Sequence, residues 1–193
     1  MIKIALVGEI GSGKSYIAKL FKYPIFNADK EVANIYKKDK ACFTKLKKKL
    51  PNYFSSFPIK KKELINSILD KKKNLKYISN IIHPIIRKKL KKFIYLNKKK
   101  KIVILDIPLY LENNINRKND IVIFIHSKKM DIAKRLIKRK GYNKFLVGKF
   151  KKIQLPIEKK KKKSKFIIKN DFTKRTAEKY VKNILNKILK WKR

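Results

Sequence analysis

The segment 8–15, which reads GEIGSGKS, constrains the fold of this chain most, because it matches the pattern G-x-x-x-x-G-K-[ST]. The apolar run before it at 4–7 is typical of a buried strand, and residues 16–21 after it are typical of a helix. In this setting glycines let successive backbone N–H groups point into one concavity, and the helix N-terminus adds a positive dipole end. Lys14 can reach the β- and γ-phosphates, and Ser15 can ligate Mg²⁺. The segment therefore predicts a nucleoside triphosphate site.

Four further apolar runs, at 24–28, 102–107, 121–125 and 166–168, have strand character. The runs at 102–107 and 121–125 are continuously apolar and rich in β-branched residues, as in strands that are covered on both faces of a parallel sheet. Helical segments separate the strands, which indicates right-handed βαβ units. We therefore predict a three-layer α/β fold, with a five-stranded parallel sheet and helices on both faces.

Between residues 37 and 101 the strand pattern gives way to helical periodicity, punctuated by Pro51, Pro58 and Pro84. We predict a helical insertion at 37–101, so that 1–36 and 102–193 form the nucleotide-binding core. In kinases of this architecture such an insertion holds the phosphate acceptor, and an ordinary helical subdomain is the alternative.

The chain after the fourth strand has the pattern of a lid. A basic helix at 130–140, a break at 141–143 and a second helix at 144–152 favour a mobile lid at about 138–154. A final amphipathic helix begins after Thr173, which is a favoured capping residue.

The composition is strongly basic, with 56 Lys and Arg against 13 Asp and Glu, for a formal net charge of +43. Only six of the basic residues are Arg, and the 50 Lys are spread along the whole chain, which is typical of a composition bias rather than of a binding face. We therefore expect no specific nucleic-acid partner, and we interpret the run at 159–163 as a solvated charge run.

The cysteine content and the length of the apolar runs indicate the compartment of the protein and its partners. A single cysteine, Cys42, cannot form an internal disulfide, and no apolar run approaches the length of a membrane span. We expect a soluble cytoplasmic protein without a membrane partner. The sequence leaves the oligomeric state open, with a monomer favoured.

Two carboxylates at strand ends are candidates for the chemistry of phosphoryl transfer. Asp29 closes the second predicted strand, where it can accept the proton of an acceptor hydroxyl or bind metal through water; its alternative role is to cap the helix at 31–36. Asp106 ends four apolar residues, the shape of a Walker B strand, and can coordinate Mg²⁺ through water or Ser15; its alternative is a plain polar residue at a strand end.

Basic residues supply further candidates. Arg135 and Arg139 lie one turn apart on the predicted lid helix, from which they can stabilise transition-state charge when the lid closes. His83 lies in the insertion with Arg87 one turn on, a candidate pocket for a phosphate of the acceptor. A structural, hydrogen-bonded histidine is the alternative for His83.

Together these motifs resemble the dephospho-coenzyme A kinase family, a family of P-loop kinases. The resemblance rests on the following segments, which occur in the family's order over nearly the whole chain: GEIGSGKS at 8–15, FNADK at 26–30, IHPIIR at 82–87, DIPLYLE at 106–112, Arg135 with Arg139, QLP at 154–156 and IIKN at 167–170. The His-Pro pair and the Asp-hydrophobic-Pro-Leu-x-x-Glu segment are much more specific than the phosphate-binding loop alone.

The resemblance implies transfer of the ATP γ-phosphate to the 3′-hydroxyl of dephospho-CoA, with Mg²⁺. It implies that ATP lies on Gly11, Ser12, Gly13, Lys14, Ser15 and Tyr16. It further implies a general base at Asp29, acceptor binding near His83, Arg87 and Asp106, lid chemistry on Arg135 and Arg139, and an adenine edge near Asn170. The insertion becomes the CoA-binding domain.

Four positions depart from the family pattern. Glu9 and Asp171 stand where glycine is usual, Asn27 replaces the first carboxylate of an Asp-Ala-Asp motif, and Tyr16 replaces threonine. None of these changes removes a group that the chemistry requires, although Asn27 leaves the base role entirely to Asp29.

Two other functions compete with this interpretation. Another small P-loop kinase would phosphorylate a nucleoside monophosphate or a small alcohol, and a panel of acceptors distinguishes it. A nucleic-acid-binding ATPase, suggested by the net charge, would show tight, steeply salt-dependent binding to nucleic acid.

Overall fold

The computed structural model describes residues 1–191, and the chain divides into two compact units. The core unit comprises residues 1–27 and the chain from 97 onward, and the helical unit comprises 28–96. The helical unit thus begins before the predicted boundary at 37, because α2 (Ala28–Lys38) contacts α5 (Lys72–Leu96) of the same unit. It also ends before the predicted boundary at 101, where α5 stops.

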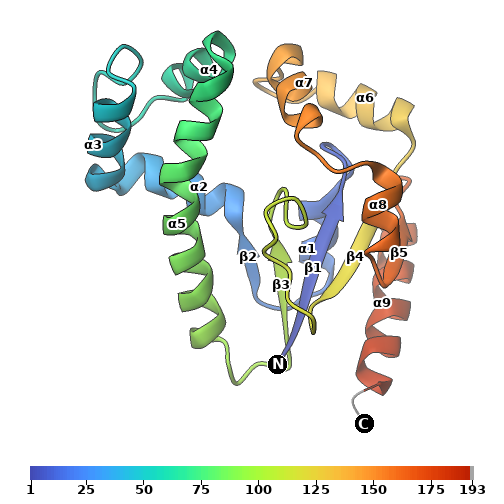
Figure 1. The fold of residues 1–193 in the computed structure, drawn as a ribbon. Coiled ribbons are helices and arrows are strands. Elements are labelled where there is room, and N and C mark those ends of the chain that lie inside the picture. Colours follow the sequence, from blue (N-terminus) through green and yellow to red (C-terminus); the bar gives the residue numbers. More distant parts are fainter. Residues whose placement is uncertain (192–193) are drawn as a thin grey trace. The chain divides into compact units, whose positions relative to one another are not determined.

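The core unit is built on an all-parallel sheet with the strand order β2-β3-β1-β4-β5 (Figure 1). The strands are β1 (Ile2–Gly8), β2 (Ile25–Asn27), β3 (Ile102–Asp106), β4 (Ile121–His126) and β5 (Phe166–Lys169). β1 is paired on both sides, with Ile4 opposite Ile104 of β3 and opposite Ile121 of β4. The predicted fold class is confirmed.

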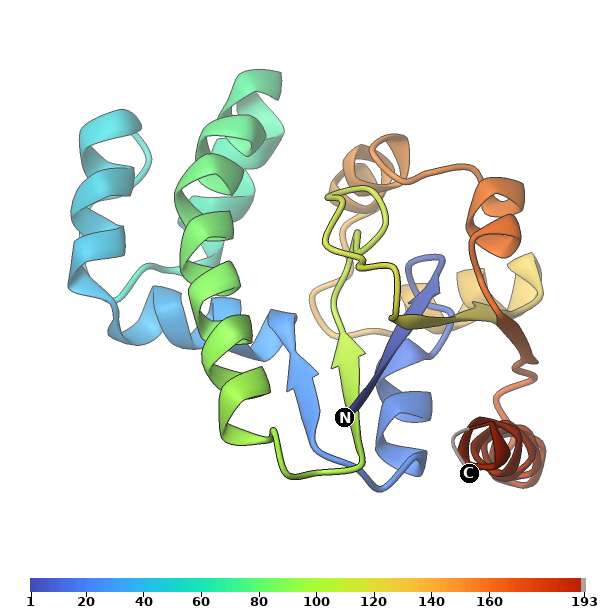
Figure 2. The same cartoon turned by 60° about the horizontal axis from the view of Figure 1, so that its bottom comes forward.

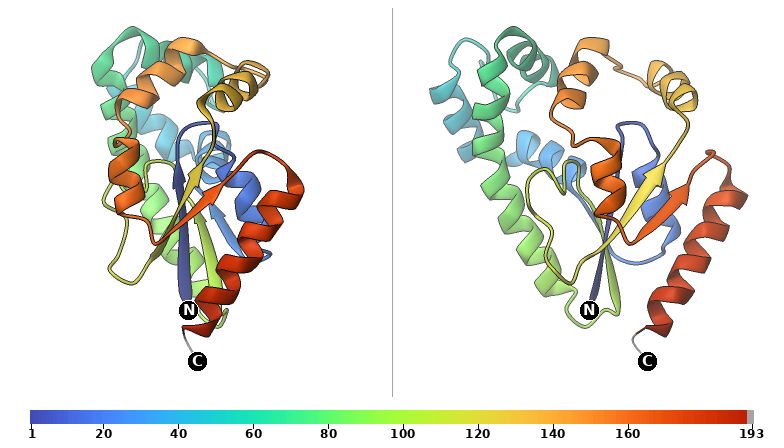
Figure 3. Two further views of the ribbon diagram at one scale, coloured as in Figure 1. Left: turned by 90° about the vertical axis from the view of Figure 1, so that its right-hand side faces the viewer. Right: turned by 45° about the vertical axis from the view of Figure 1, so that its right-hand side comes forward.

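Helices cover both faces of this sheet (Figures 2 and 3). On one face α1 (Lys14–Leu20) and α9 (Lys174–Lys190) contact each other and the strands, and on the other face α8 (Ile157–Lys162) contacts β1. Ile4 and Leu6 of β1 are buried on the α1 side, while Ala5 and Val7, which alternate with them, are buried as well. Burial of both faces explains why the strand sequences are continuously apolar.

The predicted final helix after Thr173 is confirmed as α9. The Thr173 hydroxyl accepts a hydrogen bond from the backbone N–H of Thr176 and caps α9.

The helix-break-helix pattern lies in the core unit as α6 (Lys129–Ile137) and α7 (Lys144–Lys152). Gly141 has a φ of +76°, and the Asn143 side chain caps α7 by accepting a hydrogen bond from the N–H of Leu146 at 2.9 Å. The break is therefore as predicted, whereas α6 ends at Ile137 rather than at residue 140. The mobility of the lid stays a prediction.

The helical unit contains α2, α3 (Lys40–Lys49), α4 (Lys61–Asp70) and α5, and α5 contacts each of the other three helices (Figure 2). α5 continues through Pro84, which corrects the expected interruption there. Ile78, Ile82 and Ile86 are buried at a spacing of four residues, and their burial outweighs the hydrogen bond lost at the proline. None of the helices in residues 1–191, α5 included, is long and apolar enough to cross a membrane.

The lysine run at 159–163 is not wholly solvated, which corrects its interpretation from the sequence. Lys160 Nζ lies 2.9 Å from Glu112 Oε1, and the two side chains are only 3% and 9% exposed. The same carboxylate oxygen accepts a hydrogen bond from the Leu155 N–H at 3.0 Å. Glu112 thus joins the segment after β3 to α8 through a buried ion pair.

Removing the cation of this pair tests its contribution to stability. We expect Lys160→Met to lower the free energy of unfolding by about 3 kcal/mol, because it leaves the Glu112 carboxylate buried without its countercharge. Urea denaturation followed by circular dichroism measures the change. Lys161→Met is the matched control, because Lys161 pairs with the exposed Glu158 carboxylate and should contribute less than about 1 kcal/mol. Equal losses of stability in the two variants would contradict a special contribution of the buried Lys160–Glu112 pair.

The same pair predicts a pH dependence. Burial would raise the pKa of Glu112, but the hydrogen bonds from Lys160 and from backbone N–H groups lower it overall. The stabilisation from the Glu112 carboxylate is therefore complete above the usual glutamate pKa of about 4.3. It is lost as the pH falls through the lowered pKa of Glu112 in the folded protein. The stability difference between the parent and Lys160→Met should shrink in that acidic range.

Candidate functional site

The carboxyl ends of the parallel strands meet at one edge of the sheet, where ligands of open α/β folds bind (Figure 1). Residues 8–15, hereafter the P-loop, follow the body of β1 at this edge. Asp106 ends β3, Ser127 follows β4 and Asn170 follows β5. The structure thus brings the predicted phosphate-binding residues, Asp106 and Asn170 to a common edge of the core unit.

The backbone of the P-loop requires glycine at two positions. Gly11 and Gly13 have φ values of +87° and +90°, in the left-handed region that other residues rarely adopt. A Cβ atom on Gly11 would lie 2.9 Å from Leu136 Cγ of α6, and one on Gly13 would lie 2.5 Å from Asn170 Nδ2. The loop is therefore enclosed by α6 on one side and by the residue after β5 on another.

Lys14 crosses back over the P-loop. Its Nζ donates to the carbonyl of Glu9 at 2.8 Å and to that of Gly8 at 3.3 Å. Ser15 and Tyr16 are exposed in the first turn of α1, whose first backbone hydrogen bonds go to the Gly13 carbonyl. The ammonium group and the helix N-terminus thus belong to one local structure.

Asn27, one of the departures from the family pattern, contacts Asp106. Its Nδ2 donates to Asp106 Oδ2 at 2.6 Å, across the register pair that joins β2 to β3. Asp106 is only 3% exposed, so the amide supplies a hydrogen bond to a buried carboxylate without placing a second negative charge beside it.

Asn170 contacts the P-loop directly. Its side chain is 3% exposed, and Nδ2 donates to the Ser12 carbonyl at 2.9 Å. Ser127 Oγ donates to the same carbonyl at 3.1 Å. The sequence reasoning missed Ser127, although a small polar residue directly after a central strand, at the ligand-binding edge, was a usable signal.

The two lid arginines do not share a helix face, which corrects the expectation. Arg135 lies in α6 with its guanidinium stacked 4.4 Å from the ring centroid of Phe172, whereas Arg139 lies beyond Lys138, the residue that caps the end of α6. The helix stops because the Arg139 N–H donates to the Leu136 carbonyl, three residues back, which tightens the chain into a turn.

Asp171, another departure from the family pattern, binds residues at the start of α9. Its carboxylate accepts hydrogen bonds from the N–H and hydroxyl of Thr173 and from the hydroxyl of Thr176. The backbone bond from Thr173 and the bond from Thr176 lower the pKa of Asp171. A carboxylate is also stabilised at the N-terminus of a helix.

The remaining predicted residues belong to the helical unit. Asp29 is exposed and is the second residue of α2, so it lies inside the first turn and does not cap the helix. His83 and Arg87 lie one turn apart on α5. Burial and the neighbouring charge of Arg87 lower the pKa of His83, so its imidazole is neutral near pH 7.

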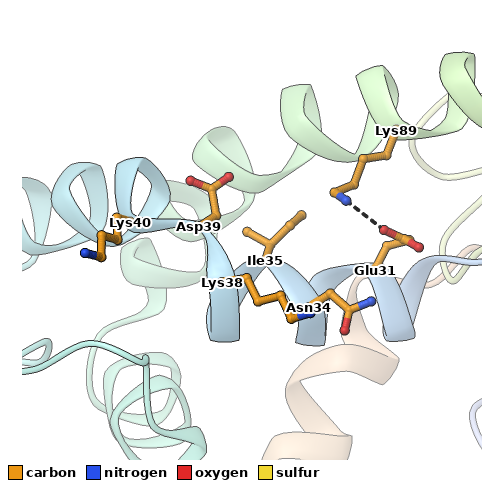
Figure 4. A pocket seen from close by; sticks show the side chains of 7 residues that line it. All are labelled: Glu31, Asn34, Ile35, Lys38, Asp39, Lys40 and Lys89. Atoms are coloured by element: carbon orange, nitrogen blue, oxygen red, sulfur yellow. Dashed lines mark ion pairs between the residues drawn. The ribbon is translucent and has the colours of Figure 1, made fainter.

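The helical unit also contains a groove of about 560 Å³ (Figure 4). Its lining residues come from α2, the start of α3 and Lys89 of α5, and an ion pair of 2.9 Å joins Lys89 Nζ to Glu31 Oε2 across it. No residue predicted for the site lines this groove.

A P-loop at the end of the central strand of a parallel sheet, with a buried carboxylate ending the adjacent strand, defines a P-loop nucleotide-binding protein. A sequence model of dephospho-CoA kinase matches residues 2–175. The dephospho-CoA kinase of Wolbachia pipientis wMel is 32% identical over 190 residues, which cover 96% of this chain and 97% of that protein. This chain belongs to the dephospho-CoA kinase family.

Solved structures agree with the fold. TT1252 from Thermus thermophilus matches with a TM-score of 0.78 at 22% identity, covering 96% of this chain and 97% of that one. Dephospho-CoA kinase from Campylobacter jejuni matches with a TM-score of 0.64 at 24% identity, covering 96% of each chain. At these identities the structural matches establish the architecture.

The pairing of Asn27 with Asp106 gives a testable prediction. Asn27→Asp places two carboxylates side by side, which raises the pKa of one of them. The variant should therefore lose stability relative to the parent as the pH rises from about 4 towards 8, because both carboxylates are then ionised in the unfolded chain and folding brings the two charges together. Urea denaturation at several pH values measures this difference. Asn183→Asp on the exposed face of α9 adds the same charge as a control, and a difference independent of pH would contradict the prediction.

Proposed function

We propose that this chain transfers the γ-phosphate of ATP to the 3′-hydroxyl of dephospho-CoA, giving CoA and ADP, the last step of coenzyme A biosynthesis. The family match over residues 2–175 carries the proposal, because it extends over both the P-loop and the helical unit. A cytoplasmic location remains a prediction that rests on the single cysteine.

The P-loop supports ATP as the phosphoryl donor. Backbone N–H groups of Gly11 and Gly13 and the start of α1 would face the phosphates, with Lys14 neutralising the β- and γ-phosphates. The Ser12 N–H donates to the Glu9 carbonyl at 3.2 Å and so holds the shape of the loop. Ser15 and Tyr16 follow at the exposed helix start. This arrangement binds the part of ATP that every nucleoside triphosphate shares, so the base must be read elsewhere.

We propose Mg²⁺ as the accompanying metal, held by Ser15 and through water by Asp29 or Asp106. Residues 1–191 contain no cluster of three or more histidine, cysteine or acidic side chains that would bind a metal by themselves. That fits Mg²⁺, which usually keeps several waters and binds through phosphate oxygens and one or two protein ligands. The metal would neutralise charge on the phosphates during transfer.

Asp29 is the proposed general base. It follows Asn27, the last residue of β2, by two positions, and its carboxylate is exposed at the start of α2. As the acceptor oxygen bonds to the γ-phosphorus and the bond to ADP breaks, Asp29 takes the proton of the 3′-hydroxyl. Asp106, held by Asn27, is buried and less suited to that exchange.

The remaining roles follow from charge and placement. His83 and Arg87 on one stretch of α5 are proposed to bind the acceptor, with Arg87 supplying the charge and the neutral His83 a hydrogen bond. Arg135 and Arg139 are proposed to stabilise the transferring phosphoryl group. For Arg135 this requires release from its stack on Phe172.

A coupled assay that detects ADP tests the reaction. With ATP, Mg²⁺ and dephospho-CoA we expect turnover that Lys14→Ala abolishes, because the variant loses the charge at the β- and γ-phosphates. Lys19→Ala, on the exposed surface of α1, is the control. Phosphorylation of AMP or shikimate without phosphorylation of dephospho-CoA would overturn the proposal in favour of another small kinase. Hydrolysis that requires nucleic acid would favour an ATPase.

The base role of Asp29 has its own test. Asp29→Asn should reduce kcat by about 100-fold or more, because the amide cannot accept the proton, while ATP affinity stays near that of the parent. Steady-state kinetics and calorimetry separate the two effects. Glu178→Gln makes the same chemical change at an exposed site on α9. Parental activity of Asp29→Asn would refute the assignment.

A further inference from the structure

The carbonyl oxygen of Ser12 is held by two strands that are distant in the sequence. Ser127, directly after β4, donates its hydroxyl to this oxygen at 3.1 Å, and Asn170, directly after β5, donates its amide at 2.9 Å. Ser12, Ser127 and Asn170 are all buried, at 0%, 4% and 3% exposure. Both lone pairs of one P-loop carbonyl are therefore occupied inside the protein.

Holding this carbonyl also orients the next N–H group. A trans peptide bond is planar, so the carbonyl of Ser12 and the N–H of Gly13 point in opposite directions. Because the carbonyl faces Ser127 and Asn170, the Gly13 N–H faces away from both of them. Within residues 1–191 that N–H donates to no protein acceptor, as expected for a donor of the phosphate-binding concavity.

The side-chain amide of Asn170 is itself held in one orientation. Its Oδ1 accepts a hydrogen bond from the Phe172 N–H at 3.1 Å, which settles the orientation of the side-chain amide. Its Nδ2 approaches the loop so closely that a Cβ on Gly13 would lie 2.5 Å away. The amide therefore fills the space that glycine leaves, and it contacts the loop through the Ser12 carbonyl.

We propose that Ser127 and Asn170 are positioning residues for the triphosphate: through the Ser12 carbonyl they hold the Ser12–Gly13 peptide so that the Gly13 N–H faces the bound phosphates. This inference rests on the proposed function only in that the P-loop binds a triphosphate. It differs from an adenine-reading role of Asn170, because the effect is exerted on the phosphates.

Isothermal titration calorimetry on the full chain tests the proposal, with magnesium tripolyphosphate and MgATP as separate ligands. We expect Asn170→Ala and Ser127→Ala each to weaken binding by up to about tenfold, the range of one hydrogen bond. Each variant should weaken the two ligands by the same factor, because both carry the phosphates that the loop holds. A loss confined to MgATP would overturn the proposal and assign Asn170 to the base.

The double variant tests whether the two side chains act through one oxygen. Each donor alone still holds the carbonyl in part, so the double variant, Ser127→Ala with Asn170→Ala, should lose more affinity than the product of the two single losses. Losses that simply multiply would indicate independent effects and would contradict a shared role.

Asn74→Ala is the matched control for a folding defect. Asn74 is 1% exposed and donates its amide to the Ser67 carbonyl at 3.0 Å, which is the same kind of bond within the helical unit. It should lower the melting temperature but leave tripolyphosphate affinity unchanged. An equal loss of tripolyphosphate affinity in Asn74→Ala would overturn the proposal. Ser127→Ala, a smaller change, keeps the test open if Asn170→Ala does not fold.

The outcome can be separated from that of the proposed reaction. If dephospho-CoA is not phosphorylated but Ser127→Ala weakens tripolyphosphate binding, the positioning role stands and the reaction falls. If dephospho-CoA is phosphorylated and tripolyphosphate binding is unchanged in both variants, the reaction stands and the positioning role falls.

Discussion

Parallel pairing of β1 with strands on both of its sides is the constraint on which the rest of the core unit depends. Because β1 is hydrogen-bonded to β3 and to β4, the P-loop leaves the sheet at its centre. The buried Asp106 ends the strand on one side, and the Ser127 hydroxyl follows the strand on the other. A phosphate-binding loop can then be held by its neighbours, which a loop at the edge of the sheet could not be.

The chain buries charge sparingly, although 36% of its residues are charged. The buried carboxylates have specific partners: Glu112 pairs with Lys160, Asp120 pairs with Lys3 at 3.0 Å, and Asp106 accepts a hydrogen bond from Asn27. Each partner offsets the cost of removing a carboxylate from water. These three contacts join the segment after β3 to α8, the residue before β4 to β1, and β2 to β3.

Much of the fold could be predicted because its signals are local. The P-loop, the continuously apolar strands and the Thr173 cap each depend on neighbouring residues, and each appears as predicted. Two predictions failed where distant contacts decided the outcome. The sequence predicts a solvated Lys160, but the side chain is buried beside Glu112. α5 continues through Pro84 because its apolar face packs on three helices. A third prediction failed for a local reason: Arg139 lies outside α6, because its N–H donates to the Leu136 carbonyl in a turn after the helix.

The sequence by itself determined the residue types of the triphosphate site, since glycines, Lys14 and Ser15 must follow a strand and open a helix for that chemistry. Only the tertiary structure decided which side chains hold the P-loop. Ser127 and Asn170 lie 115 and 158 residues from Ser12, and no local pattern relates such positions. They meet because parallel strand order brings their carboxyl ends to one edge, where a single carbonyl accepts from both.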